Sequence, residues 1–391
     1  MKIGSVSLSS PFAIAPMAGM TDTAFRRLVK RQGGCGLVVT EMVSAEGLVR
    51  GIDRTLEYAE YTEEERPVSI QIFGGDPEKM AAAAQIVESM GADIVDVNMG
   101  CPVPKIAKHN AGCSLMREPE HAASVIAAMA RAVNIPVTVK MRAGWNDGER
   151  NAPALARMVE DAGAAAVAVH GRTAAQSYSG QADWDLVAEI ADHLTIPVFG
   201  SGDCLEAGQV IDRLRQGVEG VLVGRGVLRN PWILAQAADL AAGRPPRQVT
   251  PADRGRFLLE YIELLTHERV RDDEVAGFRH VAPGTSNDEW STPNVERRTP
   301  NVERMSTSNE EQRTTNVRGV ACSHDRWVIN KIRALGSWYT KGLDNGSHLR
   351  TAVNGAESLD QLRDIVAAFF AVSAQLVAAG QVDPVGPYCG P

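Results

Sequence analysis

Short apolar runs recur through the first 225 residues, and each is followed by a polar loop and an Ala-rich or Leu-rich segment. Several runs are nearly continuous in Val, Ile and Ala, which is typical of parallel strands covered on both faces. We therefore predict strands that alternate with helices. The eight runs lie at residues 12–16, 36–40, 68–73, 93–97, 137–141, 165–170, 197–200 and 220–224.

The segments between the runs predict helices at 77–90, 118–133, 151–162 and 205–215. Gly91, Gly163 and Gly217 follow three of these segments, where a left-handed residue commonly ends a helix. Eight strand–helix units over about 240 residues favour a closed (β/α)8 barrel, an α/β fold. An open, doubly wound sheet is the alternative. In a barrel, the chemistry belongs at the C-terminal ends of the strands.

After Pro245 and Pro246 the pattern changes to long amphipathic segments at 253–274, 327–341 and 358–378. We assign residues 1–245 to the barrel domain and 246–391 to a smaller all-helical domain. A polar segment at about 280–324 interrupts the second domain, and it contains one six-residue sequence twice, at 292–297 and 299–304. It lacks apolar residues for a core, so we expect a disordered insertion. A basic arm that contacts a polyanion is the alternative.

Composition narrows the class of protein. With 44% hydrophobic residues the 391-residue chain can bury a large core, and a formal net charge of -8 restricts any nucleic-acid surface to a local patch. No apolar run reaches the roughly 18 residues of a membrane span, and the N-terminus turns polar at once. We expect a cytoplasmic protein. Its six cysteines are scattered, so we expect no disulfide framework and no metal site.

A cysteine follows the fourth run in the sequence Asn98-Met99-Gly100-Cys101-Pro102. Gly100 and Pro102 predict a tight loop that would hold the thiol over the barrel mouth. An ordinary free thiol has a pKa near 8.5, which suits a proton donor. A nucleophile assisted by His109 and an inert core cysteine are the alternatives, and chemistry alone leaves all three open.

Cationic residues end the next two runs. Lys140 points either into the barrel mouth or to solvent, and inside it would need an anionic partner such as a phosphate or an electron-rich ring. His170 ends the sixth run with the same two alternatives.

Glycine-rich turns end the last two runs, with Ser201, Gly202 and Asp203 after the seventh and Gly224 and Arg225 after the eighth. The loops after these two strands commonly form the phosphate cradle of a barrel, because glycine lets backbone N–H groups approach phosphate oxygens. The pair of turns predicts a phosphorylated cofactor or substrate.

Taken together, these motifs resemble the tRNA-dihydrouridine synthase family, and its bacterial B-type branch most closely. The resemblance covers about residues 1–240, and Trp338, Tyr339 and Lys341 resemble part of that family's helical C-terminal domain. The motifs that carry it are Pro16-Met17-Ala18-Gly19-Met20-Thr21-Asp22, Gln71-Ile72-Phe73-Gly74, Asn98-Met99-Gly100-Cys101-Pro102, Lys140-Met141-Arg142 and His170-Gly171-Arg172-Thr173.

The resemblance implies an oxidoreductase that binds FMN at the barrel mouth, uses NADPH and reduces a uridine of tRNA to 5,6-dihydrouridine. It implies hydride transfer from the flavin to C6 and makes Cys101 the proton donor to C5. Asn98 would bind the uracil edge. The residues that it implies for FMN are Pro16, Met17, Ala18, Gln71, Lys140, His170, Ser201, Gly202, Asp203, Gly224 and Arg225.

The helical domain would supply contacts to tRNA phosphates. Residues 318–350 hold six Lys and Arg against two Asp, and within them we expect Lys331 and Arg333 to bind the substrate. Three features depart from the family: Ser201 replaces a common Asn, Lys331-Ile332-Arg333 replaces an Arg-Lys-His type of sequence, and the family lacks the segment at 280–324. A flavin barrel acting on a free small molecule and a non-catalytic RNA-binding relative are the alternatives. We expect a monomer.

Overall fold

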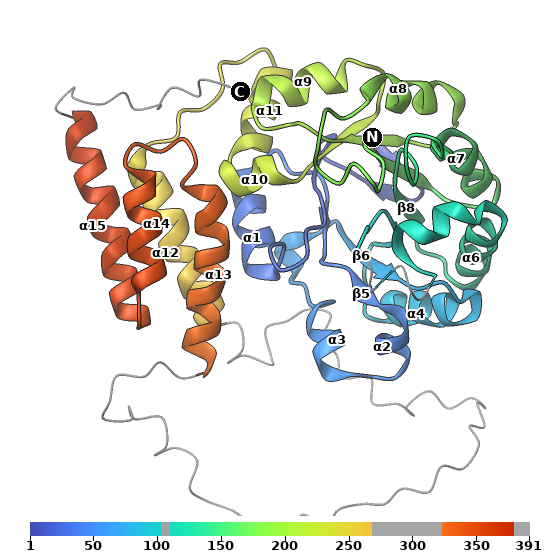
Figure 1. The fold of residues 1–391 in the computed structure, drawn as a ribbon, viewed down its shortest axis with the longest axis horizontal. Coiled ribbons are helices and arrows are strands. Elements are labelled where there is room, and N and C mark those ends of the chain that lie inside the picture. Colours follow the sequence, from blue (N-terminus) through green and yellow to red (C-terminus); the bar gives the residue numbers. More distant parts are fainter. Residues whose placement is uncertain (104–105, 107–109, 268–322, 379–391) are drawn as a thin grey trace, which may run out of the picture.

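The computed structural model describes residues 1–103, 106, 110–267 and 323–378. Within them, eight parallel strands form a barrel in the order β3-β11-β10-β9-β8-β7-β6-β4 (Figure 1). A parallel bridge between Ala13 and Leu37 joins the first strand to the last. The predicted (β/α)8 barrel is confirmed, and the open sheet is excluded.

All eight apolar runs contain a barrel strand, and no boundary moves by more than two residues. A short hairpin of β1 (Lys2–Ile3) and β2 (Val6–Ser7) precedes the barrel, and β5 (Val43–Ser44) pairs with the third barrel strand. The barrel strands are β3 (Phe12–Ile14), β4 (Val38–Val39), β6 (Val68–Phe73), β7 (Ile94–Met99), β8 (Val137–Arg142), β9 (Ala166–His170), β10 (Val198–Ser201) and β11 (Gly220–Val223).

The strands are surrounded by helices, and the four helices predicted in this region all form. These are α4 (Pro77–Ser89), α6 (Pro119–Ala132), α7 (Ala152–Asp161) and α9 (Ala207–Leu214). Gly91, Gly163 and Gly217 adopt positive φ angles, as their positions predict. Further elements are α1 (Thr23–Gln32), α2 (Ala45–Val49), α3 (Asp53–Glu57), α8 (Trp184–His193), α10 (Arg225–Arg229), α11 (Ile233–Ala241) and the 3-10 turns η1 (Glu63–Glu65) and η2 (Gly112–Arg117).

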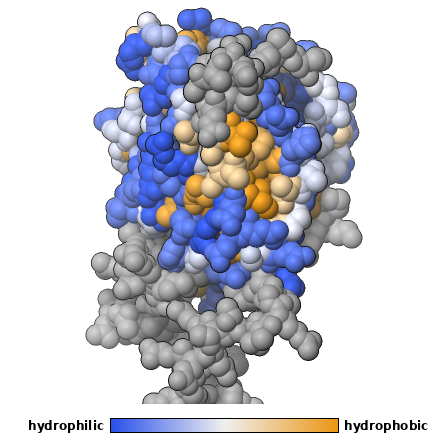
Figure 2. All heavy atoms as spheres, turned by 90° about the vertical axis from the view of Figure 1, so that its left-hand side faces the viewer, coloured by the Kyte–Doolittle hydropathy of each residue, from blue (hydrophilic) through white to orange (hydrophobic). Residues whose placement is uncertain are grey.

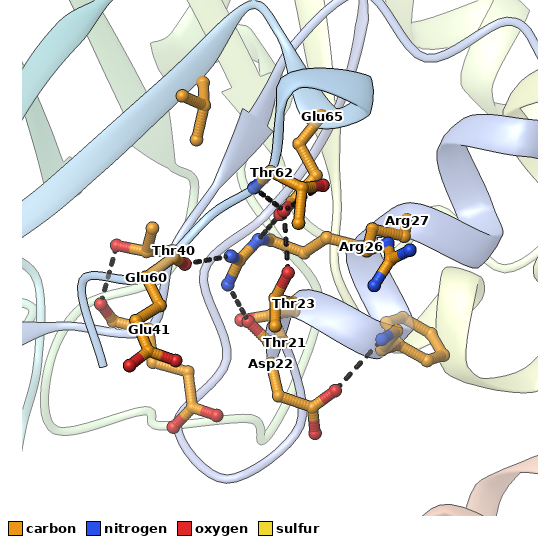
Figure 3. A network of polar contacts seen from close by, with 12 residues as sticks. Thr21, Asp22, Thr23, Arg26, Arg27, Thr40, Glu41, Glu60, Thr62 and Glu65 are labelled. Atoms are coloured by element: carbon orange, nitrogen blue, oxygen red, sulfur yellow. Dashed lines mark hydrogen bonds and ion pairs between the residues drawn. The ribbon is translucent and has the colours of Figure 1, made fainter. Parts of the chain in front are cut away.

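A buried ion pair fixes α1 to the chain before β6. Arg26 donates from Nε to Glu65 at 2.6 Å, and the two side chains are 1% and 0% exposed. Glu65 also accepts from the Thr23 hydroxyl at 2.7 Å, and the Arg26 guanidinium donates to the carbonyl oxygens of Thr21 and Glu60, both at 2.7 Å. Figure 3 shows how this network joins segments that are far apart in sequence. Burial of these charges is tolerated because each is paired and hydrogen-bonded.

A second, helical region lies to one side of the barrel (Figure 1). It consists of α12 (Pro251–His267), α13 (Ser323–Tyr339), α14 (Gly346–Gly355) and α15 (Leu359–Ala378). The predicted end of the first of these helices, at residue 274, lies outside the described residues. The expected insertion at 280–324 also lies outside them, except for its last two residues. Those two, Ser323 and His324, begin α13.

Aromatic side chains join the helical region to the barrel. Phe257 of α12 packs edge-on against Phe25 of α1, with ring centroids 6.2 Å apart, and stacks on Tyr339 of α13 at 5.8 Å. Trp232, just before α11, completes the group at 5.5 Å from Phe257. These rings belong to one buried apolar cluster that runs through the barrel and the helices. The two regions therefore share a core.

The packing of α12 against α15 depends on a glycine. A Cβ atom on Gly255 would lie 2.7 Å from Cβ of Phe370, closer than two side chains can approach. An apolar patch bordered by polar residues lies on the side of the molecule formed by the helical region (Figure 2). Val372 of α15 is an exposed large hydrophobic residue. Within the described residues, the search for helices able to span a bilayer found none of sufficient length and apolar character.

Candidate active site at the barrel mouth

A cavity of about 530 Å³ opens where the barrel strands end. The catalytic and cofactor-binding residues predicted from the sequence all line it, and so does Asn98. Residues 15–22, here called the cavity loop, contribute Ala15, Pro16, Met17, Ala18 and Met20 to its wall. The barrel therefore brings residues that are more than 200 positions apart in the sequence together at one cavity.

The polar side chains of the wall lie inside the strands rather than after them. Gln71 of β6 is the register partner of Asp96 of β7, which in turn faces Thr138 of β8. Two residues further along, Asn98 is paired with Lys140. The apolar run predicted an end for β7 at residue 97, two residues early, because β7 continues through Asn98, whose side chain the barrel interior accepts.

A chain of hydrogen bonds crosses the cavity floor. Gln71 donates from Nε2 to Asp96 at 2.7 Å, and its Oε1 accepts from Nδ2 of Asn98, also at 2.7 Å. Asp96 accepts in addition from the Thr138 hydroxyl at 2.6 Å. Burial raises the pKa of the Asp96 carboxyl, although both of these hydrogen bonds oppose the shift. Asp96 sets the orientation of the Gln71 amide, because a carboxylate can only accept.

The loop that carries Cys101 is fixed by this same chain. Oδ1 of Asn98 accepts from the backbone N–H of Gly100 at 3.1 Å and of Cys101 at 2.9 Å. Nε of Arg142 donates to the Gly100 carbonyl at 2.9 Å. Cys101 is a free, partly exposed thiol on the cavity wall. His109, the predicted partner for a nucleophile, lies outside the described residues.

Lys140 brings an ammonium group into the cavity wall. Within the described part of the chain its Nζ makes no hydrogen bond and no ion pair. Burial, together with the positive charge of Arg142, lowers its pKa to about 8. An anionic or electron-rich group in the cavity would therefore gain a charged donor that no protein group already occupies.

His170 lies beside Gly202, on the side of the cavity that the glycine-rich turns form, and is almost fully buried. Burial and the positive charges of Lys140 and Arg142, reinforced by two further arginines, lower its pKa to about 2. The imidazole is thus neutral at physiological pH and can donate one hydrogen bond from one ring nitrogen.

The two glycine-rich turns meet at one edge of the cavity. Ser201 ends β10, and Gly224 precedes α10, whose first N–H groups have no acceptor within the helix. The Asp203 carboxylate accepts from Arg172 at 2.8 Å and lies 3.7 Å from the Arg225 guanidinium. Asp203 therefore holds two arginines at this edge of the cavity, and their positive charges offset its own.

Sequence reasoning missed two residues of the cavity wall, Arg142 and Tyr178, and it also missed Arg172, which pairs with Asp203 at the cavity edge. Arg142 follows Lys140 by two positions within β8, so the strand period of two places both on the same side. Tyr178 is 60% exposed, and the guanidinium carbon of Arg225 lies 4.7 Å from its ring centroid. It stands in a loop without periodicity, so no sequence pattern indicated it.

Lys331 and Arg333 do not line the cavity. Lys331 donates to Asp22 at 2.9 Å and to the Gly19 carbonyl at 3.0 Å. Burial alone would lower the pKa of its ammonium, but the carboxylates of Asp22 and Glu41 raise it overall. Arg333 donates to the Ala356 carbonyl at 2.9 Å, at the end of α14. The ammonium group of Lys331 and the guanidinium group of Arg333 thus already have hydrogen-bond acceptors within the protein.

No cluster of three or more His, Cys, Asp or Glu side chains suited to a metal ion occurs among the residues that the structure describes. The candidate chemistry therefore consists of a thiol, an ammonium group, a neutral imidazole and a glycine-rich edge around one cavity.

Comparisons with known proteins agree on one family. The model of the dihydrouridine synthase family matches residues 13–318. A probable tRNA-dihydrouridine synthase of Rickettsia prowazekii (strain Madrid E) is 42% identical over 241 residues, which are 61% of this chain and 73% of the relative. tRNA-dihydrouridine synthase B of Xanthomonas axonopodis pv. citri (strain 306) is 41% identical over 243 residues, 62% of this chain and 73% of the relative. A probable tRNA-dihydrouridine synthase 1 of Synechocystis sp. is 40% identical over 286 residues, 72% of this chain and 80% of the relative.

Proposed function

The chain belongs to the dihydrouridine synthase family, and on this premise we propose that it reduces a uridine of tRNA to 5,6-dihydrouridine, with FMN in the cavity and NADPH as reductant. The observation that carries the proposal is the single cavity that joins Cys101, Lys140 and the glycine-rich edge. The proposal includes action as a monomer in the cytoplasm, where tRNA is modified.

The cavity wall suits a flavin mononucleotide. Lys140 offers a partly buried ammonium group that has no hydrogen-bond or ion-pair partner among the described residues, and the amide of Gln71 lines the same cavity. Both groups suit the polar edge of a flavin ring. The neutral imidazole of His170, the Ser201 hydroxyl and the start of α10 suit the phosphate end. The cavity loop supplies the apolar wall through Pro16, Met17 and Ala18, and the remaining cradle residues are Gly202, Asp203, Gly224 and Arg225. When bound, FMN supplies the hydride for C6 of the uracil ring.

Cys101 is the proposed acid. Its thiol lies on the cavity wall, and its backbone is held by Asn98, so a proton can be delivered from a fixed position to C5 of the uracil. The Oδ1 of Asn98 accepts hydrogen bonds from the loop backbone, and one of its Nδ2 hydrogens is donated to Gln71. Among the described residues, the second Nδ2 hydrogen contacts Sδ of Met42, with Nδ2 and Sδ 3.8 Å apart. In the proposed complex, an oxygen of the uracil replaces this weak contact.

Docking of tRNA is assigned to the helical region beside the cavity. Trp338 of α13 lines the cavity, so the region reaches the site directly. We propose phosphate contacts for two exposed cations, Arg326 in the first turn of that helix and Lys341 just after its end. Such contacts have to offset the few kcal/mol that unstacking a base from tRNA costs, of which stacking on the flavin ring returns about 1–3 kcal/mol.

The test is reduction of unmodified tRNA by the purified protein with NADPH, with dihydrouridine read by mass spectrometry as a gain of two hydrogens. Cys101→Ala serves as the acid variant and Cys35→Ala as a matched control, because Cys35 is buried away from the cavity. We expect yellow protein, NADPH-dependent flavin reduction in all three forms, and product in all except Cys101→Ala.

Two outcomes would contradict the proposal. Flavin reduction without product on any tRNA would favour a small-molecule substrate. Colourless protein that takes up no FMN would favour a non-catalytic RNA-binding role.

A further inference from the structure

We propose that Lys331 is a positioning residue that ties the helical region to the cavity loop, so that the wall of the FMN site depends on the seating of α13. This inference rests on the proposed function for the identity of the ligand. It assigns Lys331 a role different from the phosphate contact expected from the sequence.

The ammonium group of Lys331 reaches from α13 into the barrel. It donates to the carbonyl oxygen of Gly19 at 3.0 Å and to Oδ2 of Asp22 at 2.9 Å, and it lies 3.7 Å from Oε1 of Glu41. The three side chains are 14%, 15% and 7% exposed for Lys331, Asp22 and Glu41. The contact is thus a largely buried ionic cluster that joins three parts of the chain.

The same residue of the cavity loop, Gly19, is also held from the barrel side. Oε2 of Glu41 accepts the backbone N–H of Gly19 at 2.5 Å, while Lys331 takes the carbonyl of that residue. Gly19 has a φ of 78°, in the left-handed region that favours glycine. The loop therefore adopts one defined turn between an acceptor on the barrel and a donor on the helix.

Asp22 anchors the end of the loop in three directions. Its Oδ1 accepts from the Phe25 N–H at 2.9 Å and so caps α1, and its Oδ2 accepts from the Tyr261 hydroxyl of α12 at 2.8 Å as well as from Lys331. Figure 3 shows Asp22 and Glu41 beside the buried network of Arg26. Two helices of the helical region thus converge on one carboxylate of the cavity loop.

This arrangement argues against a phosphate contact. A phosphate approaching Lys331 would meet the carboxylates of Asp22 and Glu41 at the same point, and two negative charges already face the single ammonium group. Loss of Lys331 would instead leave the carboxylates of Asp22 and Glu41 buried without this positive charge. Buried carboxylates without a partner are unfavourable, so we expect the cavity loop to move. The residues that would move with it, Met17, Ala18 and Met20, form the cavity wall.

The first measurement needs no flavin. Hydrogen exchange of the apoprotein, read on peptides that span residues 15–22, compares wild type with Lys331→Met and Lys331→Arg. The control is Lys79→Met, which removes an equivalent ion pair, to Glu46 at 2.6 Å, on the barrel surface. We expect exchange in the loop to rise about ten-fold in Lys331→Met, as expected for coupling between contacting residues, to be largely restored by arginine, and to be unchanged in the control.

The second measurement is FMN affinity, by quenching of flavin fluorescence on titration with apoprotein, together with the visible spectrum of the bound flavin. We expect about ten-fold weaker binding and a shifted spectrum in Lys331→Met. Asp22→Asn retains an oxygen for the cap of α1 and removes the charge, so Lys331→Met should have a smaller effect in that background. Circular dichroism confirms that each variant is folded.

The outcomes separate the alternatives. Normal loop exchange and normal FMN affinity, with only a raised KM for tRNA, would overturn the proposal and return Lys331 to phosphate binding. A lower melting temperature without change in the loop or in FMN affinity would also overturn it, in favour of stability alone. If wild-type apoprotein takes up no FMN, the proposed function fails, while the exchange experiment still decides the role of Lys331 in the loop.

Discussion

The side-chain oxygen of Asn98 accepts the backbone N–H of Cys101 at 2.9 Å, three residues along the chain. We expect Asn98→Ala to slow dihydrouridine formation by about 10–100-fold, because a loop released by even 1 Å misplaces the thiol. Reduction of the flavin by NADPH should stay within about two-fold, since it needs no acid at this position. Single-turnover measurement of the two half-reactions tests this, and equal slowing of both would contradict it.

Asp96 supports the contact between Asn98 and Cys101 indirectly, through Gln71. Asp96 orients Gln71, and Gln71 orients Asn98. In Asp96→Asn an amide N–H has to face one of the two donors, so we expect a stability loss of about 1–3 kcal/mol and weaker FMN binding. Thr138→Val, which removes only one donor to Asp96, is the control and should cost less. Urea unfolding and FMN titration give both quantities, and wild-type values for Asp96→Asn would refute the role of the chain.

We expect Lys140 to make the proposed binding of FMN pH-dependent. Its pKa of about 8 in the free protein means that the ammonium group is charged below that pH and neutral above it. A ligand that needs the charged form binds less tightly as the pH rises through 8, by up to about ten-fold per unit. Lys140→Met should bind FMN more weakly and with a flat profile over the same range. A wild-type profile as flat as that of the variant would exclude contact between Lys140 and the ligand.

His170 makes the fold sensitive to acid. The unfolded side chain binds a proton below about pH 6.5, whereas the folded protein keeps the imidazole neutral down to about pH 2. The unfolded state therefore holds more protons in this window, and stability falls as the pH decreases through it. From pH 7 to pH 5 the wild type should lose about 2 kcal/mol more than His170→Asn. Urea unfolding at both pH values measures this difference, and equal losses would place a charged imidazole in the folded protein.

The buried pair of Arg26 and Glu65 predicts a large effect on stability. Glu65→Ala leaves the guanidinium buried without its carboxylate, so we expect a loss of about 3–5 kcal/mol. Asp212→Ala breaks an exposed pair with Arg215 at 3.5 Å and should cost less than about 1 kcal/mol. Denaturant unfolding of both variants tests the contrast, and similar small losses would show that the buried pair is replaceable.

The barrel was predictable because its signal is repeated. Eight apolar runs and three glycines at helix ends carry the same periodicity, and the positions of Cys101 and the two glycine-rich turns follow once the strands are placed. The buried position of Arg26 in α1 was not predictable, because its partner Glu65 lies 39 positions further along the chain. A buried charge is visible only when both members of the pair are placed in space.

The helical region shows the limit more clearly. Lys331 has the residue type and the neighbours of a phosphate-binding cation, and this was the basis for its prediction. Its carboxylate partners lie about 300 positions earlier in the sequence, in a loop and after a strand. Local charge counting cannot detect such a partner, so the ion pairs of Lys331 were not predictable, and its contact with tRNA stays a prediction.

The aromatic contact between Phe25 and Phe257 has a consequence for cutting the chain into parts. A fragment that ends at residue 245 would lack the rings of α12 and α13 and expose Phe25 and Trp232, both buried in the whole protein. Such a fragment should aggregate rather than remain as a soluble barrel, and the intact chain should melt in a single calorimetric transition. We therefore expect the barrel and the helical region to unfold together as one cooperative unit, although the sequence pattern changes after residue 245.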